Sequence, residues 1–144
     1  MKIEALKALC SGTASGQIAP LSAPLSLWGG LSLEDGMICD VNHPDYGLSL
    51  AGKVLAMPAA RGSSSSSSAL AEAARRKVAP VAIILGQADP ILTIGSLVTA
   101  DLYGVHIPIV LVPENRWGDL PVKGIVTVQS DGNLGCLRFP SKGE

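Results

Sequence analysis

A run of six serines at residues 63–68, directly after Arg61 and Gly62, is the segment whose residue types could do chemistry. Serine-rich tracts usually form flexible linkers, but a linker joins two folded units, and 144 residues provide the length of one domain. The stretch KVLAMP (53–58) before the run predicts a strand, and ALAEAARRK (69–77) predicts a helix that begins within the serines. The pattern therefore predicts a strand, a glycine turn and a helix N-terminus.

A helix N-terminus of this kind can bind an anion. Its first N–H groups have no partner within the helix and the helix dipole is positive there, so carboxylates and phosphates bind well. Gly62 lets the backbone approach a ligand closely, and the guanidinium of Arg61 can hold a carboxylate with two hydrogen bonds. The hydroxyls of Ser63, Ser64 and Ser65 add donors, or a base once one is deprotonated. We therefore expect a carboxylate or oxyanion pocket, distinct in spacing from the GxxxxGK[ST] phosphate loop and the GxSxG nucleophile elbow.

Three further residues have both a chemical and a structural interpretation. His43, in the loop NHPDYG (42–47), could bind substrate or order its loop; we favour ordering but keep it among the substrate-binding candidates. Asp89 is more readily a helix cap than an acid or base. Trp28 could lie at a subunit interface or in the core.

Composition narrows the possible partners and cofactors. The 11 Lys and Arg against 12 Asp and Glu give no electrostatic case for binding nucleic acid or an anionic membrane. Hydrophobic residues make up 47% and charged residues only 16%, which suggests that another protein covers part of the surface. The sequence shows no secretory signal and no run of about 18 apolar residues, so we expect a cytoplasmic protein without a membrane span. Three cysteines without a CxxC motif argue against a metal or iron–sulfur site within this chain, and Cys39 is expected to be a buried thiol.

The elements that position these residues are short. Residues 1–10 fit a strand or a helix, 11–17 a loop, and 18–33 an irregular extended chain that ends in a turn at Gly29 and Gly30. Apolar, β-branched segments bounded by glycine or proline predict strands at 37–41, 53–58, 81–85, 107–112, 124–128 and 134–139. We expect the α/β class, as a mixed sheet or a small barrel-like β core with flanking helices, in one domain over residues 1–144.

Two helices are expected beside this β core. The first runs from the serines to about Lys77. The second covers residues 90–103, with Asp89 as N-cap, Pro90 in the first turn and Gly104 at its C-terminal end. Its apolar residues recur at helical spacing and predict the buried face: Ile91, Ile94, Val98 and Leu102.

Two long segments together resemble a known family. LWGGLSLEDGMICDVNHPDYGLSLAGKVLAMPAARGSSSSSSALAEAARRKVAPVAIIL (27–85) and DPILTIGSLVTADLYGVHIPIV (89–110) are similar to the swivel domain, or small subunit, of aconitase X enzymes. The combination of WGG, HPDYG, PxxRGSSSSS and APxAIIL makes the resemblance specific. It implies the swivelling β/β/α fold of the mobile fourth domain of aconitases.

The resemblance also implies a reaction, a partner and a cofactor. Its members are dehydratases in which a larger subunit carries an iron–sulfur cluster on its own cysteines, and the active site lies between the two chains. Bacterial members convert cis-3-hydroxy-L-proline to Δ1-pyrroline-2-carboxylate, and archaeal members convert mevalonate 5-phosphate to trans-anhydromevalonate phosphate. We therefore expect a small subunit that binds a large catalytic subunit and a small carboxylate substrate, and that holds no cluster itself.

The wider aconitase superfamily implies the site residues, because its swivel domain carries a Gly-Ser-Ser-Arg loop whose first serine is the catalytic base. Gly62 matches the glycine, Ser63 the base and Ser64 a hydrogen-bond partner of the substrate, with Ser65 beside them. This sequence departs from the motif, since no arginine follows the serines directly and Arg61 precedes Gly62 instead.

Charge near the loop favours one substrate. A phosphorylated substrate would need more cations than Arg61 alone, so we favour the hydroxyproline reaction, with mevalonate 5-phosphate dehydration as the alternative. A phosphohistidine carrier and a non-catalytic anion-binding module are more remote alternatives. A carrier needs an exposed histidine after a Gly- or Thr-rich loop, whereas His43 lies between Asn42 and Pro44, and His106 stands at the start of an expected strand.

Overall fold

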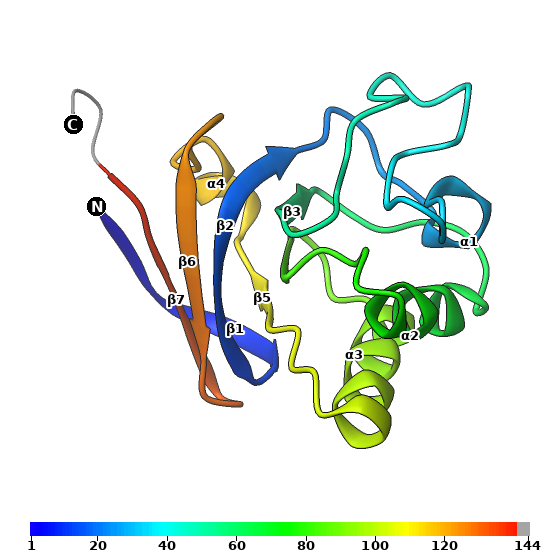
Figure 1. The fold of residues 1–144 in the computed structure, drawn as a ribbon. Helices are drawn as coiled ribbons and strands as arrows, with labels where there is room; N and C mark the ends of the chain where they lie inside the picture. The colour runs from blue at the N-terminus through cyan, green and yellow to red at the C-terminus, as the bar shows by residue number, and fades with distance from the viewer. Residues whose placement is uncertain (141–144) are drawn as a thin grey trace.

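In the described part of the chain, seven strands close into a barrel, and two longer helices pack on one side of it (Figure 1). The structure is a computed structural model that describes residues 1–140. The strands are β1 Lys2–Cys10, β2 Gly12–Pro20, β3 Val54–Met57, β4 Ala82–Leu85, β5 Ile109–Leu111, β6 Ile125–Ser130 and β7 Leu134–Arg138. The helices are α1 Leu27–Gly30, α2 Ser66–Arg75, α3 Pro90–Tyr103 and α4 Glu114–Trp117.

The barrel combines a parallel half with an antiparallel half. Its strand order is β1-β5-β4-β3-β2-β6-β7, and β7 pairs again with β1. Strands β2, β3, β4 and β5 are parallel to their neighbours in this series, and the other pairs are antiparallel. Parallel strands linked by helices are covered on both faces, and every residue of β3 and β4 is buried. This explains why both strands have uninterrupted apolar sequences.

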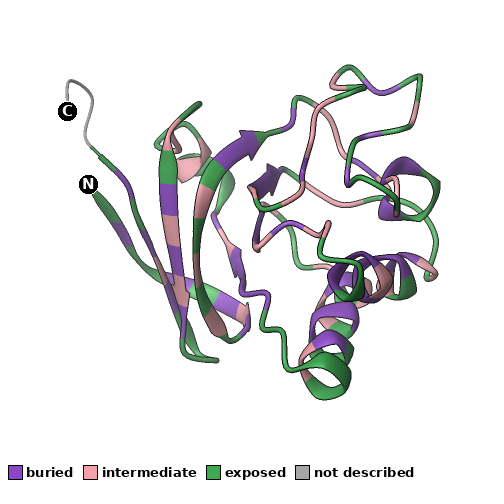
Figure 2. Cartoon of the chain, in the orientation of Figure 1, coloured by how far each residue is buried: buried purple, intermediate pink, exposed green. Residues whose placement is uncertain are grey.

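Alternate residues of the parallel strands belong to two hydrophobic clusters, because successive side chains of a strand point to opposite faces. Leu55 and Met57 of β3 belong to the cluster shared with α2 and α3. Val54 and Ala56 belong to the cluster inside the barrel. Figure 2 shows buried residues on the sides of α2 and α3 that face the strands and exposed residues on their outer sides. The end of β3 and the start of α2 are therefore fixed by packing on both sides of the sheet.

The expected class, mixed β with flanking helices, is confirmed, and the closure of the strands settles the choice between an open sheet and a barrel. Residues 1–10 contain a strand rather than a helix. No helix among residues 1–140 combines the length and the apolar run that crossing a bilayer requires.

Two expectations about the β structure are wrong. The segment 37–41 is not a strand, because it forms only single bridges, Leu31 with Ile38 and Met37 with Ser49. The segment 11–17 is not a loop, because residues 12–17 lie in β2 and pair with β6. The segment 18–33, expected to be irregular, begins with the last three residues of the same strand, which pair with β3. Small residues hide this strand in the sequence. Position 16 requires a glycine, since a Cβ there would lie 2.6 Å from the backbone oxygen of Gly52.

Helix α3 has the predicted ends but not the predicted buried face. The side chain of Asp89 accepts a hydrogen bond from the N–H of Leu92 at 2.9 Å, and Gly104 ends the helix with a φ of +67°. The buried residues are Leu92, Gly95, Ser96 and Thr99, whereas Ile94, Val98 and Leu102 are exposed and Ile91 is half-buried. The physical reason is close packing on α2: a Cβ at Gly95 would lie 3.0 Å from the Cα of Ser67. The small-residue face fits against α2 and leaves the apolar residues outside.

Candidate functional site

The serine run lies where β3 leads into α2, as the sequence predicted. β3 ends at Met57, Gly62 has a φ of +102°, and α2 begins at Ser66. Loops that follow the carboxyl ends of parallel strands form the usual ligand-binding edge of such sheets. The loop after β4, which contains Asp89, lies at this same edge, because β3 and β4 are parallel neighbours. The serines therefore form a loop and the start of helix α2, and they are not a linker between two folded units.

Gly62 is required by both its backbone conformation and its surroundings. Its positive φ is one that other residues rarely adopt. A Cβ at this position would overlap the hydroxyl of Ser26, which shows how closely the 25–30 segment packs on the loop. The adjacent backbone supports this contact, since Leu25 and Ala60 form a parallel bridge. Gly62 thus fixes where the following serine can lie.

Ser63 stands exposed at the start of this loop with its oxygen held by the backbone. Its Oγ accepts the N–H of Ser65 at 3.0 Å, and its carbonyl oxygen accepts the N–H of Ser66 at 3.0 Å. Hydrogen bonds donated to an oxygen favour its anionic form. The same bonds occupy N–H groups that the sequence had suggested for binding an anion. Ligand binding at this helix end would therefore depend on side chains and on the helix dipole more than on the amides of Ser65 and Ser66.

Ser66 has a structural role that the sequence did not distinguish from its neighbours. It is buried, and its Oγ accepts the N–H of Trp28 at 3.2 Å. The next hydroxyl, that of Ser67, instead donates to the carbonyl of Ser64 in the preceding turn at 2.9 Å. Ser66 therefore ties the segment around α1 to the start of α2. No signal within a run of identical residues could have identified it.

A small recess beside the loop brings several of the expected residues together. Arg61, Gly62 and Ser63 line it with Ser66 and Asp89, and its apolar wall consists of Leu25, Leu27, Ala60, Ile91 and Leu92. Its volume of about 10 Å³ corresponds to a single water. Asp89 caps α3, as favoured from the sequence, and also lines this recess. A recess of this size leaves any ligand larger than a water exposed on the loop.

Arg61 is the candidate cation of the loop, because the two arginines that follow the serines are bound elsewhere. The Nε atoms of Arg75 and Arg76 both lie 2.9 Å from carboxylate oxygens of Glu72. The hydrogen bonds from Arg75 and then Arg76 lower the pKa of Glu72 to about 2. Arg61 is exposed and lines the recess. It is therefore better placed than Arg75 or Arg76 to bind a carboxylate beside Ser63.

His43 is buried in its loop and does not line the recess. Its Nδ1 accepts the N–H of Asp45 at 3.0 Å, so Nε2 carries the proton and donates it to the carbonyl of Ala23 at 3.0 Å. The carboxylate of Asp45 in turn accepts the N–H and the hydroxyl of Ser22. These bonds favour the loop-ordering role. A role of His43 in substrate binding stays a prediction without support from its position.

The cysteines do not gather into a metal site in the described part of the chain. Within residues 1–140, no three His, Cys, Asp or Glu side chains are placed to bind a metal ion together, so these residues do not fit an iron–sulfur cluster. Cys39 is exposed, contrary to expectation, because its segment is a loop rather than a strand, and its Sγ contacts the carbonyl of Gly29 at 3.4 Å. Cys10 is buried, which raises the pKa of its thiol.

Comparisons with known proteins agree with the fold and show the family. The family model described as the aconitase X swivel domain matches residues 4–136. The cis-3-hydroxy-L-proline dehydratase of Pseudomonas aeruginosa is 38% identical over 75% of this chain, but the match spans only 19% of that longer protein. The phosphomevalonate dehydratase small subunit of Methanothermobacter thermautotrophicus is 31% identical over 92% of this chain and 96% of its own length. The crystal structure of Thermococcus kodakaraensis aconitase X has a chain that superposes with a TM-score of 0.81 at 27% identity, covering 96% of this chain and 99% of that one.

Proposed function

The chain belongs to the aconitase X swivel-domain family, and from this membership we propose that it is the swivel component of a hydro-lyase acting on cis-3-hydroxy-L-proline. The observation that carries the proposal is the position of Ser63, exposed beside Arg61 and the recess, with its oxygen bound by the Ser65 amide. The relatives named above are dehydratases or dehydratase subunits. The activity requires a second, larger component, because this chain spans about a fifth of the hydroxyproline dehydratase that it matches.

Each loop residue then has a role in the removal of water. Arg61 holds the substrate carboxylate, which places the adjacent carbon next to the Oγ of Ser63. Deprotonated Ser63 takes the proton from this carbon, and the hydroxyl on the neighbouring carbon leaves as water once it is protonated. The resulting enamine shifts its double bond to nitrogen and gives Δ1-pyrroline-2-carboxylate. Ser64 and Ser65 would orient the substrate.

The acid that releases the hydroxyl comes from outside this chain in the proposal. The family resemblance assigns it to an iron–sulfur cluster on the partner's cysteines, and residues 1–140 present no ligand set of their own. A base from this chain and an acid from the partner are also compatible with the recess, because its volume of about 10 Å³ means that another surface must enclose a substrate.

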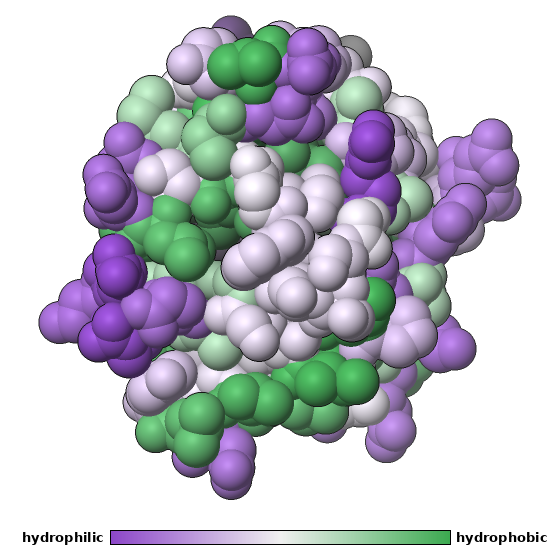
Figure 3. Space-filling view, turned by 90° about the vertical axis from the view of Figure 1, so that its right-hand side faces the viewer, coloured by the Kyte–Doolittle hydropathy of each residue, from purple (hydrophilic) through white to green (hydrophobic). Residues whose placement is uncertain are grey.

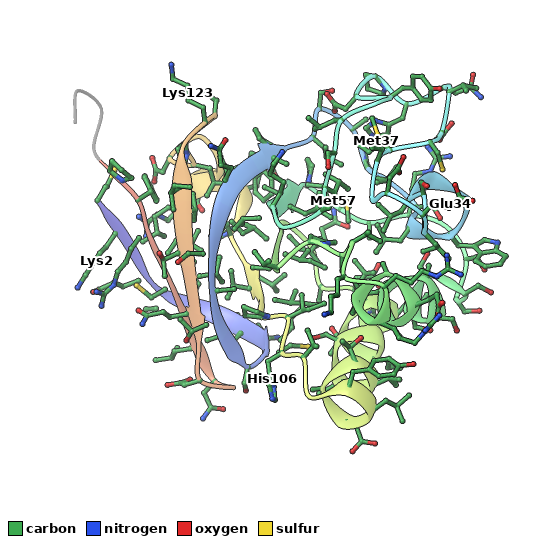
Figure 4. The ribbon with its side chains drawn as sticks, viewed as in Figure 1. Lys2, Glu34, Met37, Met57, His106 and Lys123 are labelled. Carbon is green, nitrogen blue, oxygen red and sulfur yellow. The ribbon has the colours of Figure 1, made fainter. Side chains whose placement is uncertain are left out.

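Dehydration of mevalonate 5-phosphate is the second candidate. It is favoured by the match to the Methanothermobacter thermautotrophicus small subunit, which extends over nearly all of both chains. It is placed second because Arg61 is the one arginine that lines the recess, and a phosphorylated substrate would need more cations. A phosphohistidine carrier is disfavoured, because His43 is buried and His106 lies before β5, at the opposite end of the parallel strands from the serine loop (Figure 4).

Co-expression with the aconitase X-type large subunit of the same organism tests the proposal. The purified pair should dehydrate cis-3-hydroxy-L-proline, which is measured as formation of Δ1-pyrroline-2-carboxylate. The pair should be much slower on mevalonate 5-phosphate. The reverse preference would establish the second candidate, and a pair that is inactive on both compounds with an intact cluster would contradict the proposed function.

A further inference from the structure

The outer face of α3 carries a row of exposed apolar side chains that the fold does not use. We call it the α3 stripe, and it consists of the half-buried Ile91 and the exposed Ile94, Leu97, Val98 and Leu102. Ile94, Leu97 and Leu102 are 53%, 57% and 62% exposed. Figure 3 faces the side of the molecule that carries α2 and α3 and shows a hydrophobic band along its lower edge, where α3 lies in Figure 1.

This arrangement is the reverse of an ordinary surface helix. Such a helix buries its apolar stripe and exposes its polar side. α3 instead buries Gly95, Ser96 and Thr99 against the rest of the fold. Ser96 and Thr99 satisfy their hydroxyls internally, by donating to the carbonyls of Ile107 at 2.6 Å and Gly95 at 2.7 Å. Contiguous exposed apolar surface of this kind marks an interaction site.

The α3 stripe is continuous with the serine loop. Its first residue, Ile91, lines the recess together with Arg61 and Ser63. Further along, Val98 and Leu102 line a groove of about 260 Å³ together with Ser67 and Ala71 of α2. Trp28, whose backbone N–H donates to Ser66 at the start of α2, is exposed as well. A partner protein that covers the recess would therefore contact the α3 stripe as well.

From this continuity we propose that the α3 stripe is the docking surface for the large aconitase X component, which packs on α3 and closes the recess at Ser63. The inference rests on the proposed function, since it takes the occupant to be the component that completes the active site. Two observations support that occupant. The recess holds only about one water, so the site needs a second surface next to Ile91. The relatives carry this domain either as a named small subunit or as a fifth of a longer chain.

A second copy of this chain fits the surface less well. A two-fold pair contacts itself through the same patch on both molecules. Pairing through the stripe would set only the same residues of a second copy against this face, and residues 1–140 include no set of metal ligands. Such a pair would not supply the acid that the proposed reaction needs.

Charge placed on the stripe tests the inference. Ile94→Glu and Leu97→Glu put a carboxylate into the proposed contact, and neither residue lines the recess. Leu134→Glu is the matched control, because Leu134 is 56% exposed in β7, on the antiparallel side of the barrel. Each variant is titrated into the purified large subunit by calorimetry, and its thermal midpoint is measured alone. We expect each α3 variant to raise the Kd at least about tenfold with an unchanged midpoint, and Leu134→Glu to bind as the wild type does.

Activity separates this inference from the proposed function. If the stripe docks the large subunit, more Ile94→Glu chain is needed for half-maximal dehydration, while kcat at saturation stays at the wild-type value. Equal Kd values for Ile94→Glu, Leu134→Glu and the wild type would overturn the docking surface, whether or not the pair is active. A wild-type dimer that Ile94→Glu converts to a monomer, or a wild-type chain that does not bind the large subunit, would overturn it too. A pair that is weakened by Ile94→Glu but inactive on both substrates would support the docking surface and contradict the proposed function alone.

Discussion

At the scale of single residues, six identical serines separate into different roles once their hydrogen bonds are known. Ser63 is exposed with its oxygen held by a backbone N–H, Ser66 is buried and receives the Trp28 N–H, and Ser67 binds the preceding turn. In the sequence, Ser63 could be distinguished from the other serines because it directly follows Gly62. It could not indicate Ser66, because the partner of that hydroxyl lies 38 residues away along the chain.

Ser63→Ala tests the proposal that Ser63 is the catalytic base. In the pair with the large subunit, this change should lower kcat at least ~10²-fold, the lower end of a general-base contribution, and leave assembly and cluster content intact. Ser64→Ala should raise KM more than it lowers kcat if that hydroxyl only holds substrate. Steady-state kinetics of the separate variants measures both. If Ser63→Ala kept the wild-type kcat and Ser64→Ala lost it, the base would be Ser64 and not Ser63.

Ser66→Ala tests the structural serine. Removal of its Oγ leaves the Trp28 N–H without the acceptor that it has at 3.2 Å, and the free energy of unfolding should fall by about 1 kcal/mol. Ser68→Ala is the control, because Ser68 is exposed on the same helix and alanine has the higher helix propensity. Urea unfolding of the two variants should show a loss only for Ser66→Ala. Equal midpoints would mean that the Trp28–Ser66 bond does not stabilise the loop.

At the scale of elements, the sequence was most informative where packing leaves a local pattern. The strands at 53–58 and 81–85 were predicted because burial on both faces makes β3 and β4 continuously apolar. The segment 11–17 was missed because close backbone contact at Gly16 requires small residues, which resemble a loop. The periodicity of α3 identified an apolar face correctly, but it could not say which neighbour covers that face. Within the fold the neighbour is α2, and it takes the opposite side.

The cap of α3 belongs to this scale, since Asp89 both ends the loop after β4 and lines the recess. Asp89→Ala should lower the free energy of unfolding by about 0.5–2 kcal/mol, because the N–H of Leu92 loses its acceptor. Asp89→Asn keeps an oxygen in that place and should be close to the wild type in thermal unfolding. If Asp89→Asn were as destabilised as Asp89→Ala, the loss of stability would come from the carboxylate charge and not from the capping hydrogen bond.

At the scale of the whole molecule, one set of strands serves both stability and the site. β3 and β4 contribute alternate residues to the cluster inside the barrel and to the cluster under the helices, so neither layer can separate without exposing the other. The same two strands end at the edge where the serine loop and Asp89 meet. The site residues on this edge therefore follow strands that are buried on both faces, and in the proposed function a partner contributes the groups that enclose a substrate.

This division predicts the behaviour of the chain by itself. The purified chain should unfold in one cooperative transition, because the two clusters share their strands. It should also be colourless and inactive on cis-3-hydroxy-L-proline, since the described residues offer no ligand set for a metal cluster and the recess of about 10 Å³ cannot enclose the substrate. Thermal unfolding followed by circular dichroism, a visible absorption spectrum and a dehydration assay check the three expectations. A brown chain with an iron–sulfur absorption band, or turnover without the large subunit, would place the missing chemistry within this chain and contradict its assignment to the partner.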